Sequence, residues 1–232
     1  MLATVVNSIA IILGSIIGVF VKGGIPKRFN ETIMKGISLC VLLIGLQDAV
    51  KTQNIILIIF SIVIGAIIGE LIDIDKKLKQ LGDSIENKLK GRGGKISEGF
   101  VTSSLVFCVG AMAIVGSFEA GISGKYETIF SKSIIDGITS IIFSSTLGIG
   151  VILSAVTVFI YQGTLTLASV GLKSVLTAAI INEMTAAGGL IIIGLSLNLM
   201  GVTKIKVANL LPALCVLPLI YPLINKIMIF IK

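Results

Sequence analysis

Long apolar runs without charge are the feature that most constrains this chain. The first run, Met1–Val21, contains no charged side chain, and a helix needs about 20 such residues to cross the hydrocarbon core of a bilayer. Apolar residues make up 55% of the sequence and charged residues 13%, where a soluble domain has roughly 25% charged residues. A soluble surface carrying that much apolar area would aggregate. We therefore expect an integral membrane protein, which excludes a soluble enzyme, a disordered tail and a disulfide scaffold.

The apolar runs predict an all-α fold, a polytopic bundle of about eight spans in a single transmembrane domain, residues 1–232. The predicted spans are Met1–Val21, Thr32–Ala49, Thr52–Gly69, Gly99–Phe118, Ile129–Leu147, Val151–Ala168, a span within Lys173–Val202, and Val207–Ile231. The stretch Lys173–Val202 is too long for one ordinary span, so seven or nine spans stay possible.

The connection between the third and fourth predicted spans has a periodicity of its own. Its apolar residues recur three and four positions apart, with Lys, Asp and Glu between them, and they are Ile74, Leu78, Leu81, Ile85 and Leu89. This pattern predicts an amphipathic helix at the membrane interface, followed by a basic loop, over residues 74–97. A solvated linker helix is the alternative.

The net charge of +7 indicates orientation rather than nucleic-acid binding. If the spans alternate, most Lys and Arg residues fall on the side that contains residues 22–35, 76–95 and 204–206. Cytoplasmic loops carry an excess of positive charge. We therefore expect this side, including the amphipathic helix, to be cytoplasmic and no nucleic acid to bind.

Two spans contain a small-xxx-small pattern, in which small residues four positions apart let helix backbones approach closely. One pattern is Gly14 and Gly18 in the first span, and the other is Gly65 and Gly69 in the third. Both predict packing between helices or between subunits, and they give a mild expectation of a homodimer.

Glu183 is the acidic residue that is hardest to explain as a surface residue, because apolar residues flank it on both sides. Charge inside a span is costly and tends to mark a pathway or a partner. Asn182, Thr185 and the pair Gly188-Gly189 surround it. Together they resemble an ion or substrate site in a discontinuous helix, which would break at the two glycines. A buried Glu packed against a neighbouring span is the alternative.

Two further places carry acids near membrane depth. Glu119 follows a glycine-rich stretch, so residues 110–124 predict either a second broken or re-entrant helix or an external loop. Lys132 and Asp136 lie four residues apart and so share a helix face. They form either a structural ion pair or part of a substrate or ion site.

The sequence contains no recognisable catalytic motif. The chain has no histidine, which excludes His-ligated metal sites and His-dependent triads, and its glycine-rich stretches are not followed by the Gly-Lys-Ser/Thr of a phosphate-binding loop. The three cysteines show no C-x-x-C spacing. We expect no enzyme activity, no metal and no cofactor.

The sequence resembles the YqgA/YdfK-like family of multi-pass bacterial membrane proteins over nearly its whole length. The matching stretches are Phe107–Ile114, Ser145–Val151, Tyr161–Gly163, Thr185–Gly189 and Val207–Ala213, together with Gly14, Gly18, Gly65, Gly69 and Glu70. The resemblance implies a multi-pass fold in the bacterial inner membrane and a role in transport, but it supplies no binding residues.

The leading expectation is a secondary transporter or permease for a small solute or ion, coupled to H⁺ or Na⁺ through a carboxylate inside the membrane. Glu183 is the first candidate for that carboxylate, followed by Glu119 and Asp136. A passive channel and a non-transporting membrane scaffold or accessory subunit are the alternatives.

Overall fold

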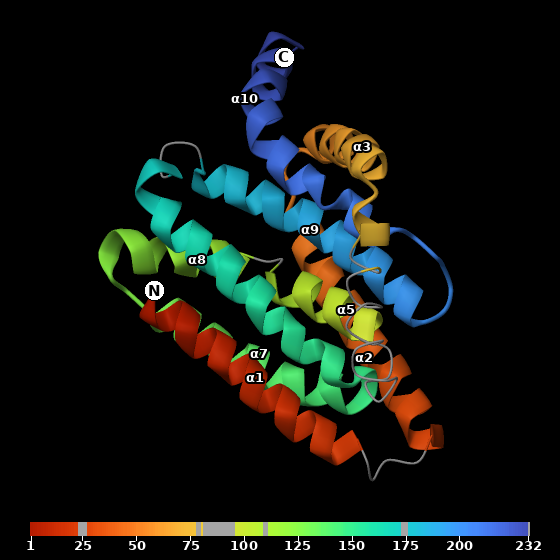
Figure 1. Ribbon diagram of the computed structural model, residues 1–232. Coiled ribbons are helices and arrows are strands. Elements are labelled where there is room, and N and C mark those ends of the chain that lie inside the picture. The colour runs from red at the N-terminus through yellow and green to blue at the C-terminus, as the bar shows by residue number, and fades with distance from the viewer. Residues whose placement is uncertain (23–26, 78–79, 81–95, 109–110, 173–175, 232) are drawn as a thin grey trace. The chain divides into compact units, whose positions relative to one another are not determined.

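The computed structural model describes the chain except for residues 23–26, 78–79, 81–95, 109–110, 173–175 and 232 (Figure 1). The described residues form helices joined by short connections, and no β-strand occurs among them. This confirms the predicted all-α fold. Most of the predicted amphipathic helix and basic loop, 74–97, lies outside the described residues.

The contacts of the chain divide it into two compact units. Unit 1 consists of Met1–Ile37 and Lys76–Leu172, and unit 2 of Ser38–Asp75 and Lys173–Lys232. Helix α2, Lys27–Ala49, contributes residues to both. Each unit therefore joins segments that are far apart in the sequence.

Unit 1 is built around three long helices, α1 (Leu2–Lys22), α7 (Glu127–Leu147) and α8 (Ser154–Leu172), of which α1 packs on both of the others (Figure 1). A short 3₁₀ turn, η2 (Ile149–Leu153), joins α7 to α8. It follows Gly148, whose φ is 87°, a conformation that favours glycine.

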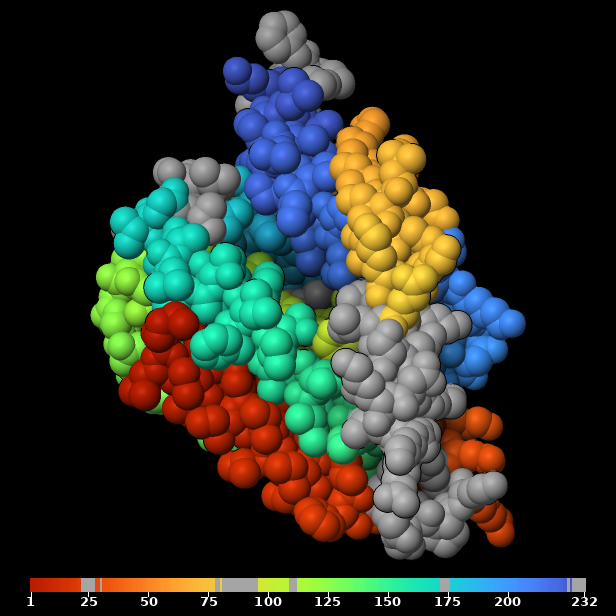
Figure 2. Space-filling model, viewed as in Figure 1, coloured from red at the N-terminus to blue at the C-terminus, as the bar shows by residue number. Residues whose placement is uncertain are grey.

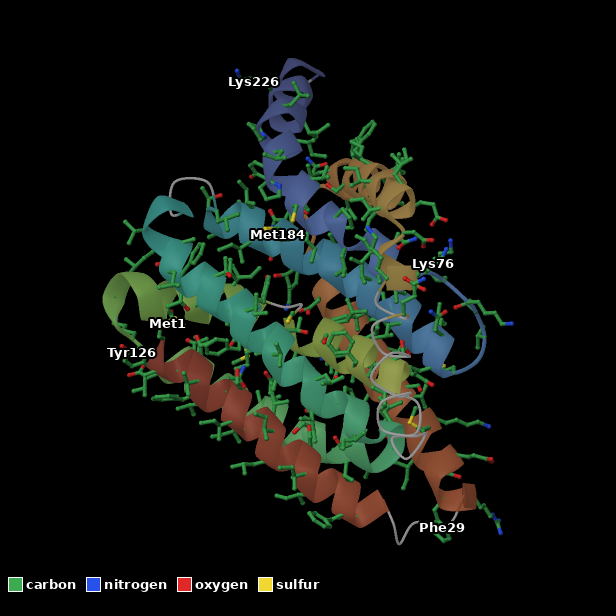
Figure 3. All side chains as sticks on the ribbon, viewed as in Figure 1. Met1, Phe29, Lys76, Tyr126, Met184 and Lys226 are labelled. Atoms are coloured by element: carbon green, nitrogen blue, oxygen red, sulfur yellow. The ribbon has the colours of Figure 1, made fainter. Side chains whose placement is uncertain are left out.

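The directions of these helices can be read from the residues that meet along them. Ala3 and Ile129 share one core cluster near the starts of α1 and α7, and Figure 3 places Met1 close to Tyr126. Further along, Gly18 packs against Ile141, so α1 and α7 are parallel. Met1 packs against Gly163 and the Ser8 hydroxyl donates to the carbonyl of Ala155, so α1 and α8 are antiparallel.

A bent helix pair lies against α8. It consists of α5 (Ile96–Cys108), then α6 (Ala111–Phe118) and the π-helical turn η1 (Glu119–Ser123), and its two parts are inclined by 57°. Of the two alternatives predicted for residues 110–124, this agrees with a broken or re-entrant helix rather than an external loop. Ser104 of α5 bonds Thr157 of α8, whereas Gly121 of η1 packs against the carbonyl of Thr166. The pair therefore follows α8 from near its beginning to near its end.

Unit 2 contains the second half of α2, α3 (Ile55–Ile72), α9 (Ala178–Leu199), the 3₁₀ turn η3 (Val207–Leu210) and α10 (Pro212–Ile231). Figure 2 shows α3 and α10 in contact. The Asn54 side chain accepts a hydrogen bond from the Leu57 N–H and caps α3, and the Thr177 hydroxyl caps α9 in the same way.

The predicted break at Gly188-Gly189 is wrong, because α9 is one continuous helix from Ala178 to Leu199. A side chain at Gly189 would collide with the backbone of α2, at the N–H of Ala49 and the carbonyl of Gly45. Glycine is needed here so that two helices can approach closely. The glycine pair therefore serves packing rather than a break in the helix.

Both small-xxx-small patterns pack helices within the chain, as the sequence predicted. Gly14 and Gly18 lie against the backbone of α7 at Gly137 and Ile141. Gly65 and Gly69 face Ala213 and Asn209, at the start of α10 and in η3. Since these faces are covered within each unit, they no longer support the expected homodimer, which stays a prediction.

Six helices of the described residues are long and apolar enough to cross a membrane. They are Leu2–Val21, Glu31–Ala49, Ile55–Ile72, Ile149–Gly171, Ala178–Leu199 and Val207–Ile224. The bent pair raises the number to 7 if it counts as one span. Helix α7, of 21 residues, has the length of a span but carries Lys132 and Asp136.

Replacing Gly69 with Ala should destabilise the protein, because the added methyl group would collide with the carbonyl of Asn209. We expect the free energy of unfolding in detergent to fall by about 1–3 kcal/mol. Gly36→Ala is the matched control, since no atom lies within 4 Å of the added methyl group. Alanine has a better helix propensity than glycine, so this variant should be as stable as the unmodified protein or slightly more stable. Equal effects of the two substitutions would contradict the packing described for Gly69.

Candidate functional site

A buried ion pair lies in the first half of α7, with Asp136 near the middle of the helix. The Lys132 ammonium donates to the Asp136 carboxylate one helical turn away, and the two residues are only 6% and 4% exposed. The Lys132 Nζ also lies 6.0 Å from the centroid of the Phe107 ring, within the range of a cation–π interaction. The structure confirms that the two charges share a helix face, and it turns that face into the interior of unit 1.

Two amide side chains from other helices complete this polar cluster. The Asn7 Nδ2 of α1 donates to Asp136 Oδ2 and to Gln162 Oε1 of α8, both at 3.1 Å. Asn7 and Gln162 are fully buried. The thiol of Cys108, at the end of α5, is close enough to interact electrostatically with both charges. Four helices of unit 1 thus meet around Asp136.

This arrangement can exchange one charged partner for another. A buried carboxylate stays ionised when an opposite charge and a hydrogen-bond donor lie beside it. Protonation of Asp136, or the approach of a cation, would weaken its bond to Lys132 and free the ammonium. The cluster therefore has the parts of a switch between a paired and an unpaired Lys132.

Glu183 has a different place, near the beginning of α9. Its Oε2 accepts a hydrogen bond from the Thr52 hydroxyl at 2.6 Å, and its Oε1 accepts from the Gln53 N–H at 2.8 Å. The neighbouring Asn182 Nδ2 donates to the carbonyl of Lys51 at 2.7 Å. These bonds attach α9 to the α2–α3 connection.

The other residues of the site predicted around Glu183 belong to a continuous helix. The Thr185 hydroxyl donates to the carbonyl of Ile181 in its own helix, and Gly188 and Gly189 are buried within continuous α9. Glu183 and Asn182 are therefore placed to hold a connection, and no helix break supplies free backbone groups beside them.

Glu119 likewise holds a connection. Its carboxylate accepts from the hydroxyl of Thr128, in the first turn of α7, and its backbone carbonyl accepts from the Lys125 N–H. Gly124 between them has a φ of 63°, which favours glycine. Glu119 is half-buried in a helical turn at the end of the bent pair.

The sequence analysis did not predict the ionic cluster that lies at the end of α3. Glu70 bonds Lys206 and accepts from Asn209 Nδ2 at 2.7 Å, while Asn209 Oδ1 accepts from the Asp75 N–H at 2.8 Å. The bond to Glu70 raises the pKa of Lys206 above its ordinary value. Both charged side chains are about half exposed, so the pair stabilises the α3–η3 contact only weakly.

Asn7 and Gln162 are not among the residues predicted for the site, yet the structure brings Asn7 to Asp136 and Gln162 to Asn7. One signal was available for Asn7, because it lies seven residues, or two helical turns, before Gly14, on the face that packs on α7. Gln162 is an amide at membrane depth, where amides usually bridge helices, but only the packing of α8 on α1 makes Asn7 its partner.

Comparisons with known proteins agree with this membrane fold. A family model described as "Protein of unknown function (DUF554)" matches residues 2–222. The chain belongs to the DUF554 family. It is 32% identical to the "Uncharacterized membrane protein YdfK" of Bacillus subtilis (strain 168), over 95% of both chains. It is 27% identical to the "Uncharacterized protein YqgA" of Escherichia coli (strain K12), over 90% of this chain and 91% of the relative. No solved structure matches.

These relatives confirm the resemblance to the YqgA/YdfK-like family. With the apolar helices of the structure, they show that this DUF554 chain is a multi-pass membrane protein in contact with the lipid bilayer.

Removing one partner of the buried pair should destabilise the DUF554 chain more than removing both. Lys132→Met leaves Asp136 uncompensated, and we expect a loss of about 3–5 kcal/mol in the free energy of unfolding. The double variant Lys132→Met with Asp136→Leu buries no charge, so its stability should return close to that of the unmodified protein. Unfolding in detergent, followed by circular dichroism, measures both. Additive losses in the double variant would show that the two charges do not act as a pair.

Removing the Glu183 carboxylate should loosen the α2–α3 connection. Glu183→Ala deletes the acceptor of the Gln53 N–H, so amide hydrogen exchange at Gln53 should become at least about tenfold faster. Glu119→Ala is the control, since its carboxylate binds a different connection within unit 1. Unchanged exchange at Gln53 in Glu183→Ala would contradict the holding role of Glu183.

Proposed function

We propose that this DUF554 chain is a secondary transporter for a small solute or ion, coupled to H⁺ or Na⁺ through the Asp136 carboxylate. One observation carries the proposal: a buried Lys–Asp pair whose Asp136 lies near the middle of a span-length helix. Asp136 accepts from the Asn7 amide of α1, which in turn donates to Gln162 of α8. Ionisable groups in such positions are costly and mark ion or proton pathways.

The position of the carboxylates favours Asp136 over Glu183 and Glu119. A coupling group has to respond to either side of the membrane, which a residue near the middle of a helix can do. Glu183 and Glu119 lie near helix ends, and each accepts hydrogen bonds from a connection. The partner of Asp136 is instead a second charge, Lys132, which can be released when the carboxylate is neutralised.

An eight-span topology is part of this proposal. Within unit 1, α1 is parallel to α7 and antiparallel to α8. In unit 2, α3 is antiparallel to α10, because Gly65 packs on Ala213 and Gly69 on Asn209. Helices α2 and α9 are antiparallel, because Gly45 packs on Ile193 and the backbone of Ala49 packs on Gly189. All these relative directions agree with eight spans that cross the membrane alternately. In this topology the basic connections lie in the cytoplasm, and the protein lies in the bacterial inner membrane.

The test is solute flux into proteoliposomes that contain the full chain. Solid-supported-membrane recordings with amino acids, organic acids and monovalent cations would find a solute, and an entrapped pH dye would report proton movement. We expect Asp136→Asn to abolish the dependence of flux on pH or Na⁺, at least about tenfold in rate, because the carboxylate that binds the coupling ion is lost. Glu119→Gln should keep coupled flux.

Three outcomes would contradict this assignment. Unchanged coupling in Asp136→Asn with loss of coupling in Glu183→Gln would return the role to Glu183. Flux that follows the gradient without saturation or coupling would indicate a passive channel. Absence of flux for every solute, with a stoichiometric co-purifying partner, would indicate a scaffold or accessory subunit. The mass of the detergent-solubilised protein would test the expected homodimer separately.

A further inference from the structure

Five buried side-chain atoms in the described residues have no hydrogen-bond partner, and all five belong to the packed helices α1, α7 and α8. They are Thr4 Oγ1, Asn7 Oδ1, Ser15 Oγ, Ser144 Oγ and Gln162 Nε2. Because hydrocarbon offers no hydrogen bonds, an unmatched polar atom costs several kcal/mol at membrane depth. Their concentration where α1 meets α7 and α8 therefore points to a ligand there. We call this interface the α1–α7–α8 seam, defined by these five residues and Asp136.

The two amide atoms are left unpaired by the network itself. The Asp136 carboxylate only accepts, so Asn7 has to present its NH₂ group, and its Oδ1 faces away. That NH₂ group also donates to Gln162 Oε1, which leaves the Gln162 Nε2 without an acceptor. Turning either amide over would place two donors, or two acceptors, against each other.

The three seam hydroxyls, unlike most buried Ser and Thr hydroxyls nearby, donate no hydrogen bond to a backbone carbonyl. Buried Ser and Thr side chains inside helices usually donate to a carbonyl of the preceding turn, as Ser133 and Ser140 of α7 do. Ser15 and Ser144 make no such bond, although both are fully buried. Ser144 also lies against Gly18 of α1, so its side chain is at the interface between the two helices.

The combination of hydrogen-bond donors and acceptors in the seam determines which ligand fits it. A cation would be repelled by Lys132 and would find a donor in Gln162 Nε2, whereas an anion would be repelled by Asp136 and would find an acceptor in Asn7 Oδ1. Hydroxyls both donate and accept. Water, which also does both and bridges otherwise unsatisfied buried groups, fits the whole set.

We propose that the α1–α7–α8 seam is an internal water site that leads to Asp136 from both directions along the helices. Thr4 lies about 5 Å before Asn7 along α1, and Ser15 about 12 Å after it, at 1.5 Å per residue. Resting on the proposed coupling role, these waters carry a proton to Asp136: each water accepts one proton and donates another, so that one H⁺ moves and no bond to a heavy atom changes. Lys132 and Cys108 are the other titratable groups beside Asp136.

Removing the hydroxyls tests the water site, because the thermal midpoint should fall if they bind water and should stay unchanged or rise if they do not. If they bind water, Thr4→Val, Ser15→Ala and Ser144→Ala each lose hydrogen bonds, and the thermal midpoint of the full chain in detergent should fall by about 2–4 °C. The matched controls are Thr185→Val and Ser103→Ala, whose buried hydroxyls donate to their own helices, and they should shift the midpoint less. An unchanged or raised midpoint in the three seam variants overturns the site, because a dry, unpaired hydroxyl only destabilises.

A water-resolving structure of the full chain gives a second readout. Water within hydrogen-bond distance of Asn7 Oδ1 and Gln162 Nε2 supports the site, and apolar contacts there overturn it. Neither measurement depends on transport. If the seam contains no water, the coupling role of Asp136 is still tested by the flux experiment. If the flux experiment fails, the water site is still supported by these measurements, but it no longer serves as a proton route.

Discussion

The Lys132–Asp136 ion pair is the interaction on which the arrangement of unit 1 depends. Neither charge can be left alone inside a bilayer-spanning bundle, so each requires a partner within the protein. The pair satisfies this requirement on α7, and it draws Asn7 from α1 and Gln162 from α8 to the same place. The parallel packing of α1 on α7 and the antiparallel packing of α8 on α1 bring these amides within reach.

Close backbone contact is the second constraint, and glycine meets it in both units. Lipid tails are as apolar as leucine, so helices associate in a membrane through packing and hydrogen bonds. Gly14 and Gly18 allow α1 to touch the backbone of α7, and Gly69 does the same for α3 on η3. The same requirement explains Gly189, which the sequence suggested as a break. A glycine inside an apolar run thus has two meanings, and only the neighbouring helix distinguishes them.

Much of the fold could be predicted, whereas the candidate site could be predicted only in part. The all-α class and the approximate positions of the spans followed from the length of the apolar runs. Glu183 looked the most deeply buried acid because apolar residues flank it on both sides, yet those residues belong to a helix that begins only five positions earlier. Its hydrogen bonds to the α2–α3 connection come from residues about 130 positions away, which no local pattern reveals.

The sequence by itself determined that this protein is helical, spans the membrane several times and uses small residues for packing. These properties depend on the length and period of apolar runs, which are local and additive along the chain. The tertiary structure decided which polar residues meet, and from these contacts we propose Asp136 rather than Glu183 as the coupling carboxylate. The physical reason is that a buried charge is stabilised by partners in space. Asn7, Asp136 and Gln162 become neighbours only when three helices pack together.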